Sequence, residues 1–383
     1  MLTSRDGSPA GLMLVLRRLF PGPEMDHVLL LAEALTAGGT AVVVVAEGGA
    51  LEHEIARRGA RFVELELDTT KARRARANAG RLAALVRENG LALIHAQDDV
   101  SLCAAGPAAQ EAGVPLVATA HRPFAVSRPL RSLCSSALAA SDRLTVSSDF
   151  VADQLQRDLN VPSDRLQVLR DGIDLAALDP AAIGGERLIE LARPWQLPDD
   201  HAVILAPALA GGRRELFTAL QEVDDLAYVC VLVPRYEEAL VNDLAAVKAE
   251  VARAGPAGRV FLAEPCRDMA AALKLADVVV LPTHEPLGFQ RLLAEAQAMG
   301  RPAIVSAVGG AVEQVSDGET GFLVAPGAAD VLAVALRHAL CLSSIERQRL
   351  SVNSIFQARK HYDRKQTIEQ TLQIYRDLLQ RQS

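Results

Sequence analysis

One stretch in the second half of the sequence concentrates residues that could bind a phosphorylated, hydroxyl-rich ligand. It covers residues 285–302, holds Glu285 and Glu295, and is followed by an apolar run and the pair Gly309 and Gly310. A carboxylate in the first turns of a helix can accept hydrogen bonds from hydroxyl groups, and the helix N-terminus favours an anion such as a diphosphate. Glycines let the backbone approach a ligand closely. The stretch therefore predicts a ligand site at the start of a helix.

The charge balance gives no overall attraction to nucleic acid. The chain has 383 residues, a formal net charge of −7 and a pI near 5.7, whereas nucleic-acid binding depends on clustered Lys and Arg. One basic stretch, residues 71–76, could contact lipid headgroups or an anionic acceptor, although a solvated helix start is the favoured interpretation. We expect no nucleic-acid partner and leave peripheral membrane contact open.

Cysteine usage and the N-terminal region indicate a cytoplasmic protein. The apolar run at residues 11–16 is too short to span a bilayer, and Arg17 and Arg18 follow it, which is the wrong order for a signal peptide. We predict cytoplasmic residence, with contact at the inner face of the cytoplasmic membrane left open. The cysteines are scattered, with no CxxC pair and no His at metal-ligand spacing, so we expect reduced, mostly packed thiols at Cys103, Cys134, Cys230, Cys266 and Cys341.

The chain is long enough for two domains, and its patterning is that of layered α/β proteins. Half of the residues are hydrophobic but only 4% are aromatic, and short apolar runs alternate with helical patterns. This alternation predicts βαβ units and parallel sheets. The predicted strands are residues 12–16, 41–46, 62–65, 92–95, 116–119, 143–146 and 166–169, then 202–206, 227–233, 260–262, 278–281, 302–306 and 321–324. The predicted helices are residues 25–37, 51–58, 77–89, 102–112 and 149–159, then 269–275, 292–299, 329–340 and 367–379.

A lapse in the pattern marks the expected domain boundary. After Asp174 the sequence runs into Pro180, a pair of glycines and Pro194, and a new apolar strand begins at Ala202. We predict an N-terminal domain at residues 1–180 and a C-terminal domain at residues 181–355. A C-terminal helical segment, residues 356–383, is expected to pack back on the first domain.

The stretch from residue 285 to residue 321 resembles the donor-site signature of a large retaining glycosyltransferase family, the family four or group 1 type, which includes sucrose synthase-like and lipopolysaccharide-core enzymes. In that family an acidic residue, an aromatic-glycine pair and a second Glu open a helix beside the nucleotide sugar, and a Gly-Gly turn follows the next strand. The resemblance extends over nearly the whole chain, through segments such as residues 118–121, 147–152 and 172–174. It implies a GT-B fold, with two Rossmann-like domains whose parallel sheets face a central cleft.

The resemblance also implies roles for individual residues. Glu285 is the candidate to substitute for the acidic residue of the catalytic site through a local loop shift, and His121 is expected to lie close to the transferred sugar, although a surface His in a loop is the alternative. Gly22 belongs to the N-terminal glycine-rich loop. The expected donor-binding residues are Glu295 at the ribose, Arg213 and Arg214 at the diphosphate, Phe289, and Gly309 and Gly310 at the donor-side backbone.

Several positions depart from the family's ligand-site pattern, while the packing pattern is kept. Leu287 stands eight residues before Glu295, where the family has the first Glu of its pair, and Glu285 lies two residues too early. Ala208 stands where an Arg of the diphosphate clamp is expected, and the loop after it is shortened. We therefore expect relaxed or altered donor binding. Further departures are Gln290 for Gly, Pro21 and Pro23 with Glu24 and Asp26 in the N-terminal loop, and Asp171 where Asn or Arg is common.

Three functions fit these observations. The leading one is transfer of a sugar from a nucleoside diphosphate sugar to a saccharide or lipid-linked acceptor, with retention at the anomeric carbon, in synthesis of cell-envelope polysaccharide or lipopolysaccharide. The resemblance implies no metal and no further cofactor, since helix dipoles and basic side chains meet the leaving-group charge. The second is a catalytically degenerate GT-B protein that acts as a scaffold or regulator. The third, epimerisation of an activated sugar, lacks a distinctive acid-base pair in the sequence.

Overall fold

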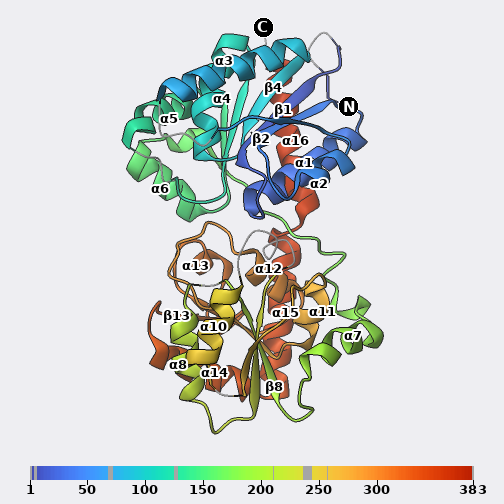
Figure 1. Ribbon diagram of the computed structural model, residues 1–383, viewed down its shortest axis with the longest axis vertical. Helices are drawn as coiled ribbons and strands as arrows, with labels where there is room; N and C mark the ends of the chain where they lie inside the picture. Colours follow the sequence, from blue (N-terminus) through green and yellow to red (C-terminus); the bar gives the residue numbers. More distant parts are fainter. Residues whose placement is uncertain are drawn as a thin grey trace. The chain divides into compact units, whose positions relative to one another are not determined.

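The computed structural model describes residues 2–3, 7–67, 72–124, 128–209, 211–235, 244–256 and 258–381. The chain divides into two compact units, residues 1–171 with 365–383, and residues 172–364. Each unit is built on one parallel β-sheet with helices packed against it (Figure 1). The predicted α/β class with two parallel-sheet domains is confirmed.

The sheet of the first unit has seven strands in the order β3-β2-β1-β4-β5-β6-β7, and all neighbouring strands are parallel. The strand order changes direction at β1, which lies between β2 and β4. In open α/β sheets such a switch point, at the carboxyl ends of the strands, is where ligands bind. The strands are β1 (Gly11–Arg18), β2 (Val42–Glu47), β3 (Arg61–Glu64), β4 (Leu91–Ala96), β5 (Leu116–Ala120), β6 (Arg143–Val146) and β7 (Leu166–Val168).

Burial on both faces of this sheet explains why its strands are continuous apolar runs. Along β1, Leu12, Leu14 and Leu16 belong to one buried cluster, while Met13 and Val15 belong to the cluster on the other face. Successive side chains of a strand point to opposite faces, so a sheet covered on both faces needs an apolar residue at every position. The sequence pattern of β1 is therefore a direct consequence of its central place.

Helices of the first unit begin where side chains satisfy their free backbone N–H groups. Asp98 caps α4 by accepting a 2.7 Å hydrogen bond from the backbone N of Ser101, and Ser148 caps α6. Because Asp98 and Ser148 follow β4 and β6 closely, these caps fix how the chain leaves the sheet. The helices are α1 (Pro23–Ala37), α2 (Glu52–Arg57), α3 (Ala72–Glu88), α4 (Asp99–Ala112), α5 (Arg128–Ala140), α6 (Asp149–Leu159) and α16 (Arg364–Arg381), with a 3₁₀ turn, η1, at Ser163–Arg165.

The second unit repeats this plan with six parallel strands in the order β10-β9-β8-β11-β12-β13. Here the switch point lies at β8, between β9 and β11. The carboxyl ends of β8, β9, β11 and β12 therefore bring the predicted donor-binding loops to one edge. The strands are β8 (Ala202–Pro207), β9 (Tyr228–Val233), β10 (Val260–Leu262), β11 (Val278–Leu281), β12 (Ala303–Ser306) and β13 (Phe322–Val324).

The helices of the second unit include several that the sequence did not predict, namely α7, α8, α10, α13 and α15. Among them α15 is one of the longest, and a capping box between Ser343 and Glu346 starts it. The helices are α7 (Gly185–Trp195), α8 (Arg213–Gln221), α10 (Ala245–Ala254), α11 (Met269–Leu275), α12 (Arg291–Ala298), α13 (Ala311–Gln314), α14 (Ala329–Leu340) and α15 (Ser344–His361), with a 3₁₀ turn, η2, at Pro180–Ala182.

The boundaries between the units differ from the predicted ones. We placed them after residues 180 and 355, whereas the units divide after residues 171 and 364. The reason is a bridge that joins the two crossing segments: the backbone N of Ile173 donates to Tyr362 O, and the backbone N of Arg364 donates to Ile173 O. Ile173 is also buried in the core of the second unit. Both segments therefore belong to that unit, and only α16 returns to the first.

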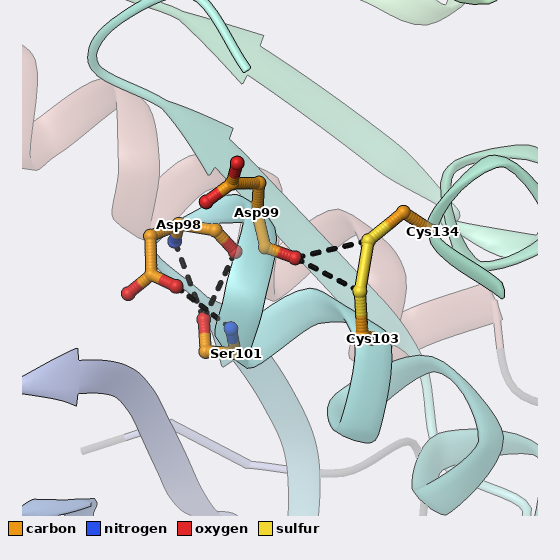
Figure 2. The surroundings of a disulfide bond; sticks show 5 residues. All are labelled: Asp98, Asp99, Ser101, Cys103 and Cys134. Atoms are coloured by element: carbon orange, nitrogen blue, oxygen red, sulfur yellow. Dashed lines mark hydrogen bonds between the residues drawn. A yellow bond between two sulfur atoms is a disulfide. The ribbon is translucent and has the colours of Figure 1, made fainter. Parts of the chain in front are cut away.

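The expectation that all cysteines are reduced is wrong for Cys103 and Cys134, which form a disulfide between α4 and α5 (Figure 2). The two helices pack closely because Gly106 has no side chain: a Cβ atom there would lie only 2.4 Å from the Cβ of Ala137. This approach brings the cysteine Cα atoms to 4.8 Å, within the range that a disulfide spans. Both sulfur atoms also lie near the backbone carbonyl oxygen of Asp99, at 3.2 and 3.1 Å.

Candidate functional site

Polar side chains follow four neighbouring strands of the first unit at the carboxyl edge of the sheet. Gln97 follows β4, His121 follows β5, Ser147 follows β6, and Asp171 lies three residues beyond β7. Since the strands are parallel, these residues gather at one edge, and α1 adds His27 to the group. Of this group the sequence predicted His121 as a site residue.

His121 is fixed by hydrogen bonds from three sides. Its Nδ1 lies 2.9 Å from Oδ1 of Asp171, and its Nε2 lies 3.1 Å from Oε1 of Gln97. The hydroxyl of Ser147 donates a 2.8 Å hydrogen bond to the backbone carbonyl of His121. The side chain is fully buried, so the alternative of a surface His in a loop is wrong.

The hydrogen-bond partners of His121 suit a charged ring. Both of its nitrogens face oxygen atoms, and a ring protonated at both nitrogens donates to each of them. Burial lowers the pKa of His121, but the carboxylate of Asp171 outweighs burial and raises that pKa above its ordinary value. Among the described residues, Oδ2 of Asp171 and Nε2 of Gln97 have no hydrogen-bond partner although both atoms are buried. The site thus holds a buried histidine with a raised pKa, together with a spare acceptor and a spare donor.

Two further histidines surround His121 and are neutral. Their rings make edge contacts, with centroids 5.0 Å apart for His27 and His121 and 5.8 Å apart for His27 and His95. Burial and the nearby His121 lower the pKa of His27 to about 4, and burial and His27 lower the pKa of His95 well below its usual range. His95 is held by Thr119 and by Tyr375 of α16. The returning helix, red in Figure 1, therefore completes this cluster.

Gly22 lies beside an ion pair that joins α1 to the loop after β5. A Cβ atom on Gly22 would lie 3.3 Å from Oε2 of Glu24 and 3.6 Å from Nη2 of Arg122. Glu24 and Arg122 pair at 2.7 Å. The added negative charge that the sequence showed at this turn is therefore balanced by Arg122, which is next to His121 in the chain.

In the second unit three loops at the carboxyl edge of the sheet touch through their backbones. Gly212, after β8, donates its N–H to Pro282 O, after β11. Gly309, after β12, adopts a φ of 58°, and a Cβ atom there would lie 2.5 Å from Leu287 O. Gly310 donates its N–H to the same Leu287 oxygen at 2.8 Å. The Gly-Gly pair thus accommodates the loop that contains Leu287, and the Gly310 N–H is already used.

Glu295, the predicted ribose ligand, is bound by two arginines. Its side chain is 4% exposed; one oxygen pairs with Arg235, and the other accepts a 2.9 Å hydrogen bond from Arg291 Nε. Burial raises the pKa of Glu295, but the Arg235 and Arg291 charges outweigh it and hold the pKa below its ordinary value. A ligand hydroxyl would have to compete with these guanidinium groups for the carboxylate.

The other predicted residues of this unit lie in different surroundings. Phe289 is buried in the core against Tyr362, with ring centroids 5.4 Å apart. Glu285 is exposed on the loop after β11. At the start of α8, Arg213 pairs with Glu250 at 2.7 Å and donates to Ala208 O, whereas the side chain of Arg214 is exposed. The structure thus leaves Glu285 and Arg214 accessible and commits Phe289 and Arg213 to packing.

Several residues of these clusters were not predicted from the sequence, for different reasons. Arg291 precedes Glu295 by four residues, a spacing that brings side chains together on a helix, so a signal was present. Arg235 follows β9 and carried no such signal, and Gln97 and His27 reach His121 only through the fold. Within the residues that the structure describes, no group of three or more His, Cys, Asp or Glu is arranged to hold a metal ion.

Comparison with protein families assigns both halves of the chain. Residues 26–177 match the family described as Glycosyltransferase Family 4, and residues 214–341 match the family described as Glycosyl transferases group 1. The first match begins after β1 and covers most of the rest of the first unit, and the second begins in α8 and covers the loops after β9, β11 and β12 of the second unit. Together the matches span well over half of the chain.

Curated relatives have the same type of name. A D-inositol 3-phosphate glycosyltransferase of Nocardioides sp. is 29% identical over 257 residues, covering 62% of this chain and 54% of the relative. The protein of the same name from Mycobacterium bovis is 30% identical over 264 residues, covering 62% of this chain and 51% of the relative. The chain therefore spans about half the length of the curated relatives it matches.

Solved structures establish the fold. A glycosyltransferase from Rickettsia africae superposes with a TM-score of 0.86 at 19% identity, covering 97% of this chain and 99% of the other. HepE of Anabaena, solved in complex with UDP, superposes with a TM-score of 0.81 at 16% identity, covering 96% and 100%. At these identities the likeness shows the GT-B fold alone. The chain thus carries a Glycosyltransferase Family 4 domain followed by a Glycosyl transferases group 1 domain, on a GT-B fold.

Proposed function

We propose that the chain transfers a glycosyl group from a nucleoside diphosphate sugar to a saccharide or lipid-linked acceptor, with retention of the anomeric configuration. The observation that carries the proposal is the buried, charged His121 at the carboxyl edge of the first sheet, in a chain whose halves match two glycosyltransferase families. A fixed cation is suited to an anionic donor, because preorganised charge stabilises charge that develops during reaction. The proposal needs no metal ion, since arginines and helix N-termini supply positive charge.

In this proposal each unit contributes a separate part of the reaction. Arg214 and the N-terminus of α8 meet the diphosphate, which carries the leaving-group charge. Glu295 binds the ribose only if the hydroxyls displace a guanidinium. His121 donates a hydrogen bond from Nε2 to the transferred sugar in place of its bond to Gln97, with Asp171 holding Nδ1 and thereby the ring orientation.

The comparisons suggest donors and acceptors for the first assays. HepE was solved with UDP and with UDP-glucose, and the curated relatives are named for D-inositol 3-phosphate. We propose a uridine diphosphate sugar as the first donor to test. The acceptor panel comprises saccharides, lipid-linked saccharides and a phosphorylated inositol. We place the activity in the cytoplasm, in synthesis of cell-envelope polysaccharide or lipopolysaccharide, on the resemblance alone.

Thermal shifts against nucleoside diphosphates and their sugars test donor binding directly. A ligand at about one hundred times its dissociation constant adds about 2.7 kcal/mol to stability, so binding raises the melting temperature of the second unit. A base-selective shift, followed by release of the nucleotide only when an acceptor is present, supports the proposal. Product analysis by NMR then decides retention. A protein that melts cooperatively and shows no shift with any donor refutes it.

A second function, a catalytically degenerate scaffold, is favoured by one specific observation. The carboxylate of Glu295 is already bound by two arginines, and Leu287 stands where the first Glu of the pair is expected. Leu287→Glu discriminates between the two functions, because Leu287 is half-buried on a loop whereas Ala208 is fully buried and would not accept Arg. Activity in both the natural protein and the variant supports the enzyme. Activity that appears only in Leu287→Glu supports the scaffold.

A further inference from the structure

Helix α15 of the second unit presents large apolar side chains to solvent. Ile345, Val352 and Phe356 are 79%, 59% and 68% exposed. Their spacing of seven and four residues places them within about 40° of one another around the helix. Leu350 and Ala358, on the opposite face, are buried in the protein core. The helix therefore has two apolar faces, one packed and one open.

Cations flank the open face. By helix geometry Arg349 and Arg359 lie about 40° to either side of Ile345, and Lys360 lies about 60° away; all three are exposed. Glu346, the one acid within this helix, lies about 100° away and is hydrogen-bonded to the capping Ser343. We use the name α15 ridge for the exposed face formed by Ile345, Arg349, Val352, Phe356, Arg359 and Lys360.

We propose that the α15 ridge docks on an anionic lipid surface. Helices that bind in the membrane interface combine apolar side chains, which enter the headgroup and acyl boundary, with Lys and Arg that pair with anionic headgroups. The α15 ridge has this combination. No helix in the described part of the chain is long and apolar enough to cross a bilayer, so the contact would be peripheral.

Shape and charge favour lipid over a protein partner. The three apolar side chains project from a single helix, so a rigid partner would need a matching groove, whereas a lipid surface deforms around them. A second copy of the chain using the same face would oppose arginines with arginines, which is repulsive. An anionic lipid leaflet supplies negative charge at its surface and a deformable apolar layer beneath it. The proposal does not rest on transfer activity.

Co-sedimentation of the full chain with vesicles tests the proposal. We expect binding to vesicles of phosphatidylcholine mixed with phosphatidylglycerol, little binding to phosphatidylcholine alone, and loss of binding as salt screens the cations. The double variant V352S/F356S should bind at least about tenfold more weakly, because burial of these side chains drives insertion. Replacing the three cations by Gln should weaken binding by a similar factor and flatten its salt dependence.

A matched control uses two exposed apolar residues on another helix of this unit. Val331 and Val334 on α14 are 43% and 71% exposed, and V331S/V334S should bind vesicles as the natural protein does. Thermal melting of each variant reports whether it is folded. The proposal is overturned if the natural protein ignores anionic vesicles at low salt, or if V352S/F356S binds them unchanged. A dimer in solution that V352S/F356S dissociates, with no vesicle binding, would instead assign the ridge to self-association.

Discussion

Replacing Asp171 by Asn tests whether a charged His121 forms the centre of the first unit's site. The change keeps the side-chain shape but removes the negative charge 2.9 Å from His121 Nδ1. Burial alone opposes the charged ring, so His121 then loses its proton near neutral pH. A hydrogen bond to a charged group contributes about 1.5–3 kcal/mol. We expect the variant to lose about that much stability near pH 6, which for a domain of this size lowers the melting temperature by roughly 3–12 °C.

The pH dependence distinguishes this reasoning from a simple packing effect. The pKa of His121 is raised in the folded protein above its usual value of 6.5. Its contribution to stability is therefore complete below the unfolded pKa and is lost as the pH rises through the folded pKa. Asp171→Asn removes that contribution. The gap in unfolding free energy between the two proteins should be largest near pH 6 and should shrink toward alkaline pH.

Urea unfolding at several pH values measures this gap, and the chain offers an internal control. Its one tryptophan, Trp195, lies in the second unit, so Trp fluorescence follows that unit while far-UV circular dichroism follows both. Asp149→Asn, which removes an exposed carboxylate 3.2 Å from Arg170, is the matched variant and should cost less than about 1 kcal/mol. A gap that stays constant with pH, or grows toward alkaline pH, would refute the charged state of His121.

Three further predictions concern groups with opposite or independent effects. The pKa of His27 is about 4 in the folded protein, whereas His27 of the unfolded chain binds a proton below about pH 6.5, so the free energy of unfolding falls as the pH drops from 6.5 to 4. His27→Gln should reduce this fall, measured by urea unfolding, by roughly 3 kcal/mol. The Cys103–Cys134 disulfide joins residues 31 apart, so C103S/C134S should lose about 3–4 kcal/mol; titration of the unfolded, unreduced chain should find three thiols, and five would contradict the disulfide. Glu295→Gln leaves two partly exposed guanidinium groups without their carboxylate and should destabilise the second unit by about 3 kcal/mol; a loss below about 1 kcal/mol by Trp fluorescence would show that this pair contributes little.

The sheets could be predicted from the sequence because strands buried on both faces form continuous apolar runs. Val42 to Ala46 and Val278 to Leu281 are apolar at every position, since both faces of each sheet are covered. All the predicted strands are found, and their predicted ends lie within two residues of the observed ends. The same rule fixes the α/β class, because parallel strands need helical crossovers between them.

The missed helices carry no comparable pattern. Helix α7 lies in the segment interpreted as a lapse, because Gly184, Gly185 and Pro194 are usual helix breakers; the structure places Pro194 inside the helix, in its last turn. Helix α15 is apolar on two faces, so the exposed Val352 and Phe356 obscure the 3.6-residue period of its buried side. Local periodicity therefore fails to predict a helix that also carries apolar residues on its exposed face.

The candidate site could be predicted only in part for a related reason. His121 was found through its segment, but its charge depends on Asp171, fifty residues later in the sequence, and on a Gln97 that no motif marks. Arg235 reaches Glu295 across sixty residues. Such pairs depend on strand order, which brings the ends of β4, β5 and β7 together in one unit and the end of β9 close to α12 in the other. A single sequence gives the strands but not the partners of their last residues.

The two units therefore differ in what a ligand must do to bind. In the first unit the charged His121 is already held by Asp171, with a buried acceptor and a buried donor left over, so a polar ligand gains hydrogen bonds without breaking an ion pair. In the second unit Glu295 is neutralised by arginines, and the Gly310 N–H is bound to Leu287. A donor entering there must first replace these contacts with its own, and a phosphate that draws the arginines away from the carboxylate would do so. In the proposed reaction, the departures in the second unit would therefore shift donor recognition from the ribose hydroxyls toward the anionic phosphates.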